Sequence, residues 1–150
     1  MIVYLDVSAL VKRYVTESGS KEVIALTAVA AAVATALVSR AEVAAAFSRA
    51  VRLGVLDRDG GRRAQHRFSR EWPDLARIPV TEALVARAET LAWEHGLRGY
   101  DAVQLAAALT WRDSIGEDVV LATFDRELWQ STRSEGLQPW PEKLAGGDAP

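Results

Sequence analysis

Short apolar runs alternate with helical segments along most of this chain, and this alternation constrains its fold more than any other feature. The run from Ile2 to Leu5 is rich in strand-forming residues, and the segment after it has the apolar spacing of a helix. The pattern predicts further strands at 33–38, 77–80, 117–124 and 137–140, with helices between them. Strands that alternate with helices form a parallel sheet with helices on both faces. We therefore expect one α/β domain over residues 1–140 and a flexible C-terminal tail over 141–150.

Local signals place several helix ends. The segment 39–54 has helical spacing and closes at Gly54. The polar segment 57–72 predicts another helix, with a break at Gly60 and Gly61. Thr81 is placed as the N-cap of a helix that ends at Gly96, where the preceding histidine contributes to the C-terminal cap.

The composition narrows the chemistry that a site could use. The chain has 150 residues, enough for one continuous core, and its net charge of -2 gives no overall field that would attract nucleic acid. It has no cysteine, which excludes disulfides, thiolate nucleophiles and zinc fingers and fits a reducing cytoplasm. A metal site would have to be built from oxygen, which favours Mg²⁺ or Mn²⁺. We do not expect the N-terminal segment to be a secretory signal, because it has an acid at its sixth residue, and the longest uncharged run, 23–39, is short for a membrane span.

Four carboxylates stand where strands give way to helices or where helices begin. Asp6 and Asp125 each directly follow a predicted strand, so they should lie at the same edge of the sheet. Glu42 and Asp101 fall in the first turns of their predicted helices. That edge is where ligands collect in parallel sheets, so it is where we expect the chemistry.

Each of these acids alone also has a structural explanation. Aspartate is a favoured N-cap, and Ser39 with Glu42 matches the pattern of a capping box. Taken one by one, the acids favour the capping interpretation. Four acids at one edge would repel one another unless a cation neutralised them, and a hard divalent ion does so. Water activated by such an ion can attack a phosphodiester without a serine or histidine nucleophile.

Four stretches carry a family resemblance: YLDVSALVKRY, SRAEV, GLRGYDAVQLAAAL and LATFDREL. In this order, and over nearly the whole chain, they resemble the PIN-domain ribonucleases, most closely the VapC toxins of toxin–antitoxin pairs. The resemblance implies an Mg²⁺- or Mn²⁺-dependent endoribonuclease that hydrolyses RNA with a metal-activated water. It also implies the role of toxin in a type II system, inhibition by a cognate VapB-type antitoxin, and a homodimer.

The resemblance also assigns residues. It makes Asp6, Glu42, Asp101 and Asp125 the catalytic, metal-binding acids. Ser8 and Thr123 stand where the family tends to carry a hydroxyl near the metal, although a second capping group and an ordinary strand residue are equally good interpretations.

A basic segment is the candidate RNA contact. Seven arginines lie between 49 and 70, against two aspartates. Arginine binds phosphate in a bidentate manner, so Arg62 and Arg63, together with Lys12 and Arg13 near the first acid, are possible RNA-binding residues. A solvated helical face is the alternative, and it is the one the arginine-rich composition favours. The five tryptophans are expected in the core or in a dimer interface.

Three other functions are alternatives to the nuclease. A haloacid-dehalogenase-type phosphatase requires a second acid two residues after the first, where this chain has Ser8. A response-regulator receiver requires an acidic pair and a late lysine, and neither is present. The non-enzymatic alternative is a protein-binding module of the same fold that pairs with a partner through its alanine-rich helices.

Overall fold

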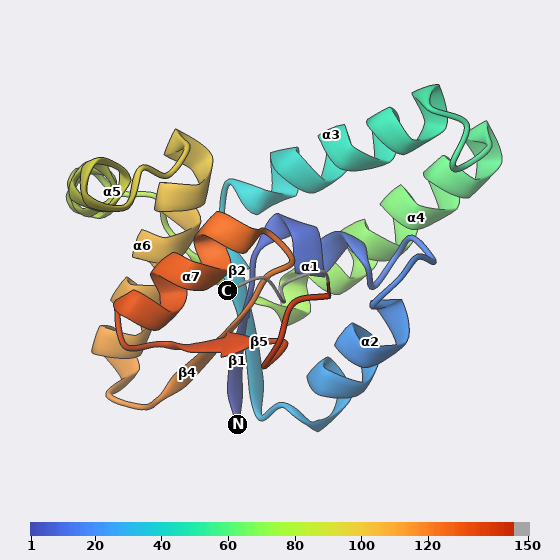
Figure 1. Ribbon diagram of the computed structural model, residues 1–150. Helices are drawn as coiled ribbons and strands as arrows, with labels where there is room; N and C mark the ends of the chain where they lie inside the picture. Colours follow the sequence, from blue (N-terminus) through green and yellow to red (C-terminus); the bar gives the residue numbers. More distant parts are fainter. Residues whose placement is uncertain (146–150) are drawn as a thin grey trace.

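A five-stranded parallel sheet forms the centre of the protein (Figure 1), whose computed structural model describes residues 1–145. The strands are β1 (Ile2–Leu5), β2 (Ala32–Ala36), β3 (Ala76–Ile78), β4 (Val119–Ala122) and β5 (Gln138–Trp140). Their order in the sheet is β3-β2-β1-β4-β5, and each neighbouring pair is parallel. The predicted α/β class with a parallel sheet is therefore confirmed.

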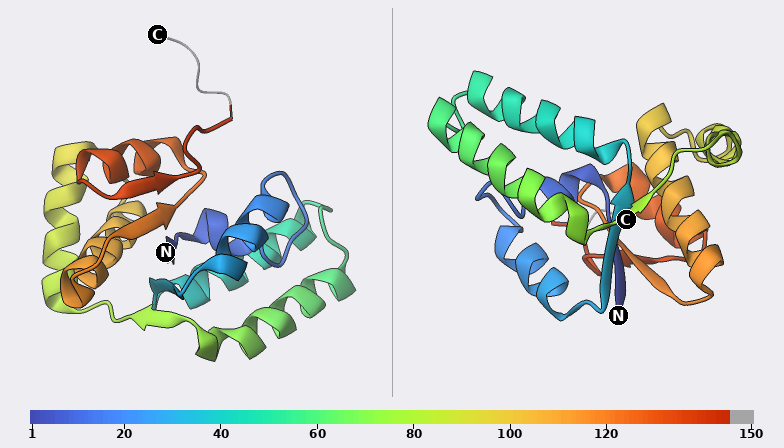
Figure 2. Two further views of the ribbon diagram at one scale, coloured as in Figure 1. Left: turned by 90° about the horizontal axis from the view of Figure 1, so that it is seen from below. Right: turned by 180° about the vertical axis from the view of Figure 1, so that it is seen from behind.

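Helices cover both faces of this sheet (Figure 2). One face carries α1 (Val7–Val11), α2 (Ser20–Val29), α3 (Ser39–Arg52) and α4 (Arg58–Glu71), and the other carries α5 (Glu82–His95), α6 (Gly99–Ile115) and α7 (Arg126–Ser134). A short 3₁₀ helix, η1 (Trp72–Asp74), follows α4. Helices α3 and α4 run side by side and extend away from the sheet (Figures 1 and 2).

The core divides into two layers because successive side chains of a strand point to opposite faces. Val3 and Leu5 of β1 pack into the layer under α1–α4, whereas Tyr4 packs into the layer under α5–α7. Leu105 and Leu109 of α6 are fully buried in that second layer. Each such side chain contributes about 1.5–3 kcal/mol on burial, so α6 is held firmly against the sheet.

Two of the predicted helix ends are confirmed and one predicted break is wrong. Thr81 caps α5 by accepting a hydrogen bond from the Leu84 N–H at 3.2 Å, and Gly96 ends it with a φ of 64°. Helix α4 is continuous through Gly60 and Gly61. These glycines lie in its first turn, and a Cβ at Gly61 would come within 2.5 Å of Val51, so glycine there allows α3 and α4 to pack closely.

The connection pattern explains where a site can form. From β1 the chain proceeds to β2 and β3 on one side, and it later returns to β4 and β5 on the other side of β1. Strands β1 and β4 are neighbours, paired from Ile2 with Val119 to Leu5 with Ala122. Their carboxyl ends lie at the point where the direction of the connections reverses, and ligands bind at such points in open parallel sheets.

The structure describes the first five residues, 141–145, of the predicted flexible tail. Residues 141–145 contain no helix or strand, but the Trp129 indole N–H donates to the Pro141 carbonyl at 2.7 Å. Residues 146–150 of the predicted tail lie outside the described residues, so its flexibility stays a prediction. Over residues 1–145, none of the helices has the length and apolar character needed to cross a bilayer.

Candidate metal centre

Asp6 lies directly after β1, at the carboxyl edge of the sheet, and its side chain is 3% exposed. It is the N-cap of α1, because Oδ1 accepts a hydrogen bond from the Ala9 N–H at 2.9 Å. The expected capping role is therefore real. It does not use the whole carboxylate, since Oδ2 faces a different group.

Two hydroxyls hold the remaining positions of this carboxylate. Ser8 Oγ donates to Oδ1 of Asp6 at 2.7 Å, and Thr123 Oγ1 donates to Oδ2 at 2.7 Å. Each hydroxyl also accepts a backbone N–H beyond β4: Ser8 from Phe124 at 2.8 Å and Thr123 from Asp125 at 3.1 Å. The structure thus places both predicted hydroxyl residues beside Asp6, where they fix its orientation and link the ends of β1 and β4.

Glu42 is in the first turn of α3, but the predicted capping box is wrong. The N-cap of α3 is Val38, with no side-chain cap, and Ser39 is a buried residue inside the helix. The Glu42 carboxylate instead accepts a hydrogen bond from Gln104 Nε2 at 3.0 Å. This contact joins α3 to α6 and directs the Glu42 side chain towards the helix that carries Asp101.

Gln104 belongs to a buried polar network that sequence reasoning missed. Its side chain is 2% exposed, its Oε1 accepts from the Tyr4 hydroxyl at 2.6 Å, and its Nε2 also donates to Ser39 Oγ at 2.9 Å. Thr35 donates to Ser39 in turn at 2.8 Å. Buried polar groups occur where their hydrogen bonds are satisfied, as they are here. The sequence signal that could have identified Gln104 is its spacing, because it follows Asp101 by about one helical turn and so lies on the same face of the helix.

Asp101 and Asp125 come together through Arg98. Asp101 is in the first turn of α6, and Asp125 is the N-cap of α7, with Oδ1 accepting from the Leu128 N–H at 2.9 Å. Arg98 Nε donates to Asp101 Oδ2 at 2.9 Å, and its Nη2 donates to Asp125 Oδ2 at 3.2 Å. The two acids therefore share one cation, although Asp101 has no strand before it.

Electrostatics place three of the acids in one region. Burial, together with the charge of Asp101, raises the pKa of Asp6 to about 6, although the hydrogen bonds from Thr123, Ser8 and Ala9 oppose the shift. Burial also raises the pKa of Glu42, with the Gln104 hydrogen bond opposing the shift and the charge of Asp101 adding to it. Asp101 thus interacts by its charge with Asp6 and Glu42, and Arg98 links it to Asp125.

This donor set fits a hard divalent cation. Its ligand atoms are carboxylate oxygens, which Mg²⁺ and Mn²⁺ prefer, and the two buried or half-buried acids are costly to ionise without a nearby positive charge. Arg98 already supplies one cation to Asp101 and Asp125, so this part of the site is built to hold positive charge. Magnesium sites keep several waters, so the acids need not enclose the ion by themselves.

A second group of possible ligands lies at the C-terminal ends of α5 and α7. Ligand atoms of Glu94, His95 and Glu135 lie within 4.8 Å of one another. His95 Nε2 forms a 2.6 Å hydrogen bond with Glu135 Oε1. His95 therefore does more than the predicted C-terminal capping, because it ties α5 to the end of α7, and an ion there would have to break this contact.

The predicted basic residues differ in how far they are engaged. Lys12 Nζ bonds Glu17 at 3.0 Å and lies 4.5 Å from the centre of the Phe124 ring, while Arg13 pairs with Glu71 at 3.3 Å. Arg62 and Arg63 are exposed on α4, and Arg62 Nη1 lies 4.0 Å from Asp59 Oδ1.

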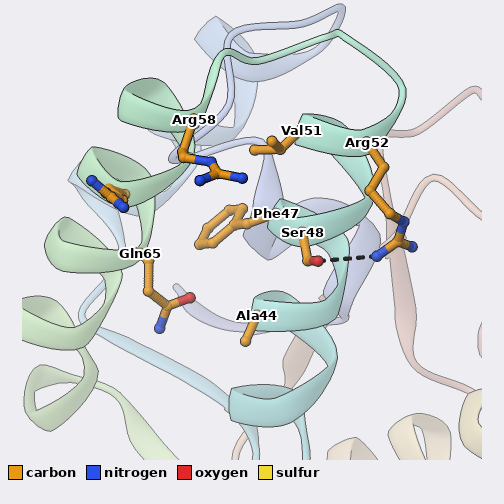
Figure 3. A pocket seen from close by; sticks show the side chains of 9 residues that line it. Ala44, Phe47, Ser48, Val51, Arg52, Arg58 and Gln65 are labelled. Atoms are coloured by element: carbon orange, nitrogen blue, oxygen red, sulfur yellow. Dashed lines mark hydrogen bonds between the residues drawn. The ribbon is translucent and has the colours of Figure 1, made fainter.

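Arg62 belongs to the lining of a groove between α3 and α4, whose floor is apolar and whose rim is basic (Figure 3). Phe47 and Val51 form the floor, and Arg58 extends over Phe47. Arg52 is directed away and donates to Ser48 Oγ at 3.0 Å. The predicted arginine segment is therefore partly a groove wall and partly an ordinary solvated face.

Comparisons with known proteins identify the family. The family model described as the PIN domain matches residues 3–132. Ribonuclease VapC45 and Ribonuclease VapC49, from two strains of Mycobacterium tuberculosis, are each 33% identical to this chain over 143 residues, which is 95% of this chain and 97% of theirs.

Solved structures share the fold at lower identity. FitAcB from Neisseria gonorrhoeae has a TM-score of 0.65 at 17% identity and covers 93% of this chain and 96% of its own. VapBC2 from Rickettsia felis, bound to a promoter DNA fragment, has a TM-score of 0.63 at 14% identity, with 93% and 97% covered. A toxin–antitoxin complex from Klebsiella pneumoniae has a TM-score of 0.59 at 20% identity, with 82% and 86% covered. The chain belongs to the PIN-domain family and is a relative of the VapC ribonucleases.

Proposed function

We propose that this protein is a metal-dependent endoribonuclease that acts as the toxin of a type II toxin–antitoxin system. The observation that carries the proposal is that Asp101 interacts by charge with Asp6 and Glu42 and is linked through Arg98 to Asp125, in a chain whose relatives are named ribonucleases. These four acids would hold Mg²⁺ or Mn²⁺. A divalent ion at such a site activates water and stabilises the negative charge that develops on the phosphodiester during hydrolysis.

The surrounding residues have positioning roles in this proposal. Ser8 and Thr123 hold the Asp6 carboxylate in one orientation, and Gln104 does the same for Glu42. Groups that orient metal ligands affect both metal affinity and activity. The chain has no cysteine, and its two histidines lie on α4 and at the end of α5, so these acids are the chemically active groups at this edge.

The test is the substitution Asp101→Asn, which keeps the side-chain shape and removes the charge. Mn²⁺-dependent cleavage of RNA should fall by about a hundredfold or more, since losing a ligand should cost at least as much as losing a group that orients one. Circular dichroism should show an unchanged fold. Asp118→Asn is the matched control, because this exposed aspartate precedes the amino end of β4, whereas Asp125 follows its carboxyl end.

The outcomes separate the candidate functions. Unchanged cleavage by Asp101→Asn would contradict the assignment. If the wild-type protein neither binds a divalent ion by calorimetry nor cleaves RNA, the non-catalytic protein-binding module becomes the better interpretation. Restoring activity after EDTA treatment with Mg²⁺ and Mn²⁺ in separate reactions identifies the ion.

Exposed arginines are our proposed contacts for the RNA backbone. Arg62 and Arg63 lie at and beside the groove between α3 and α4, whereas Lys12 and Arg13 are already paired within the chain. The double charge reversal Arg62→Glu and Arg63→Glu should weaken RNA binding, and more so at low salt. Binding is best measured in the Asp101→Asn background, where RNA is not cut.

The exposed apolar surface of α5 and α6 is our proposed homodimer contact. Trp93 is 91% exposed, Tyr100 is 65% exposed and Val85 is 44% exposed, and Val85 and Tyr100 border an apolar hollow between the two helices. The tryptophans are expected in the core or in a dimer interface; Trp72 and Trp111 are buried in the core, whereas Trp93 is exposed, and the interface stays a prediction for it. Sedimentation of the wild type and Trp93→Glu should show a dimer that the substitution weakens.

The antitoxin is proposed from the relatives. Three similar structures are a toxin–antitoxin complex, VapBC2 and FitAcB. We infer that this chain binds a VapB-type antitoxin that inhibits it. Co-expression with a small DNA-binding protein encoded directly upstream should give a stable complex in which RNA cleavage is suppressed.

A further inference from the structure

Arg98 occupies an unusual position among the four acids. It is the N-cap residue of α6, in extended conformation, and its side chain does not cap the helix. The guanidinium reaches across to α7 instead, so it contacts Asp101 and Asp125 together. The Arg98 side chain remains 74% exposed, which leaves it free to leave this position without disturbing the core.

In Asp125, Arg98 uses the carboxylate oxygen that remains available to a metal ion. Oδ1 of Asp125 is committed to capping α7, so Oδ2 is the oxygen available to a ligand, and Arg98 donates to it. In Asp101 the contact is again with Oδ2. A guanidinium and a divalent ion on the same two carboxylates would repel each other, so both cannot bind there at full strength.

We propose that Arg98 is an intramolecular counter-ion that competes with the divalent metal for Asp101 and Asp125. The inference rests on the proposed function, because it requires that these acids bind a metal. Without metal, Arg98 neutralises two carboxylates that would otherwise repel each other. When metal binds, the guanidinium is displaced into solvent, and its exposure keeps the cost of displacement small.

Metal affinity measured in the absence of RNA tests the competition. Mn²⁺ is titrated by calorimetry into the full-length wild type and into Arg98→Gln, which removes the charge and keeps a polar side chain. The variant should bind Mn²⁺ roughly two- to fivefold more tightly, the size expected from removing an exposed ion pair. The gain should shrink as salt is added, because the competing interaction is screened.

Arg87→Gln is the matched control. Arg87 forms a 2.9 Å ion pair with Asp113 on the α5 and α6 surface, so the substitution removes a comparable pair elsewhere. It should leave Mn²⁺ affinity unchanged. If Arg98→Gln binds Mn²⁺ with the same affinity as the wild type, the proposal is overturned. If it binds Mn²⁺ more weakly, the proposal is also overturned, because Arg98 would then be organising the ligands.

Thermal unfolding gives an independent readout. In EDTA, Arg98→Gln should unfold at a lower temperature than the wild type, because its two acids have lost their counter-ion. In saturating Mn²⁺ this deficit should disappear, and a deficit of the same size with and without metal would contradict the competition. If the wild type cleaves RNA with Mn²⁺ while affinity is insensitive to Arg98→Gln, only this inference fails. If the wild type shows neither Mn²⁺ binding nor cleavage, the proposed function fails with it.

Discussion

Asp6→Asn should make the metal-free protein more stable at neutral pH, although it removes the most buried of the four acids. Burial raises the pKa of Asp6 to about 6 in the folded protein, whereas the unfolded chain has the ordinary value of 3.8. Below pH 3.8 the carboxyl is neutral in both states and costs nothing. Between pH 3.8 and 6 the unfolded chain loses its proton first, so stability falls as pH rises.

The size of the effect follows from the two pKa values. Their difference corresponds to a penalty that grows from about 0.6 kcal/mol at pH 4 to about 3 kcal/mol at pH 7 and then stays constant. Asparagine keeps the Oδ1 contacts with Ser8 and the Ala9 N–H, but its amide meets the Thr123 hydroxyl in place of Oδ2. Allowing about 1 kcal/mol for that altered hydrogen bond, the net gain at pH 7 is about 2 kcal/mol.

The assay is urea denaturation in EDTA between pH 4 and 8, with Asp118→Asn as the exposed-carboxylate control. The stability difference between Asp6→Asn and the wild type should increase with pH and level off above pH 6. A difference that does not change with pH would refute the reasoning, as would an Asp6→Asn variant less stable than the wild type at pH 8. Adding Mn²⁺ should reverse the order, since a ligand at a hundred times its Kd stabilises the folded state by about 2.7 kcal/mol.

Two further predictions concern the framework around the site. Gln104→Met removes the amide that accepts from the Tyr4 hydroxyl and donates to Glu42. The variant should lower the free energy of unfolding, measured in urea, by about 1–3 kcal/mol and reduce RNA cleavage about 10- to 100-fold. Full activity would mean that Glu42 does not need this partner. Gly61→Ala places a methyl 2.5 Å from the Val51 side chain and should destabilise the folded protein by about 1–3 kcal/mol. The control Gly99→Ala places its methyl where nothing lies within 4 Å and should leave the stability unchanged. Equal melting temperatures of the two variants would contradict the close packing of α3 and α4.

The parts of this protein that sequence reasoning predicted are those governed by local rules. Strand and helix positions follow from apolar periodicity, and the order of the elements then selects a parallel sheet. Asp6 and Asp125 could be located because each directly follows a predicted strand, and both lie beyond the carboxyl end of the observed strand, Asp6 after β1 and Asp125 after β4. Boundaries were less accurate: the second strand ends at Ala36, two residues before the predicted end.

The parts that sequence reasoning missed depend on contacts between distant segments. Ser39 and Glu42 have the spacing of a capping box, but Thr35 and Gln104 engage Ser39, so the local motif never forms. Arg98 and Asp101 are three residues apart, which is an ordinary spacing for a pair within a helix. The second partner of Arg98 is Asp125, 27 residues further along the chain at the start of α7. No spacing rule reports that kind of contact, because it exists only after the sheet has brought α6 and α7 together.

The Tyr4 hydroxyl has a consequence that reaches beyond its place in the core. By donating to one end of the Gln104 amide, it leaves the other end to donate to Glu42. A phenylalanine at this position would fill the same space, but the amide could then rotate and present its oxygen to a carboxylate. Tyr4→Phe would therefore leave the packing of the core unchanged but alter the orientation of the Glu42 carboxylate. A substitution in the middle of the sheet can thus affect the function of the site.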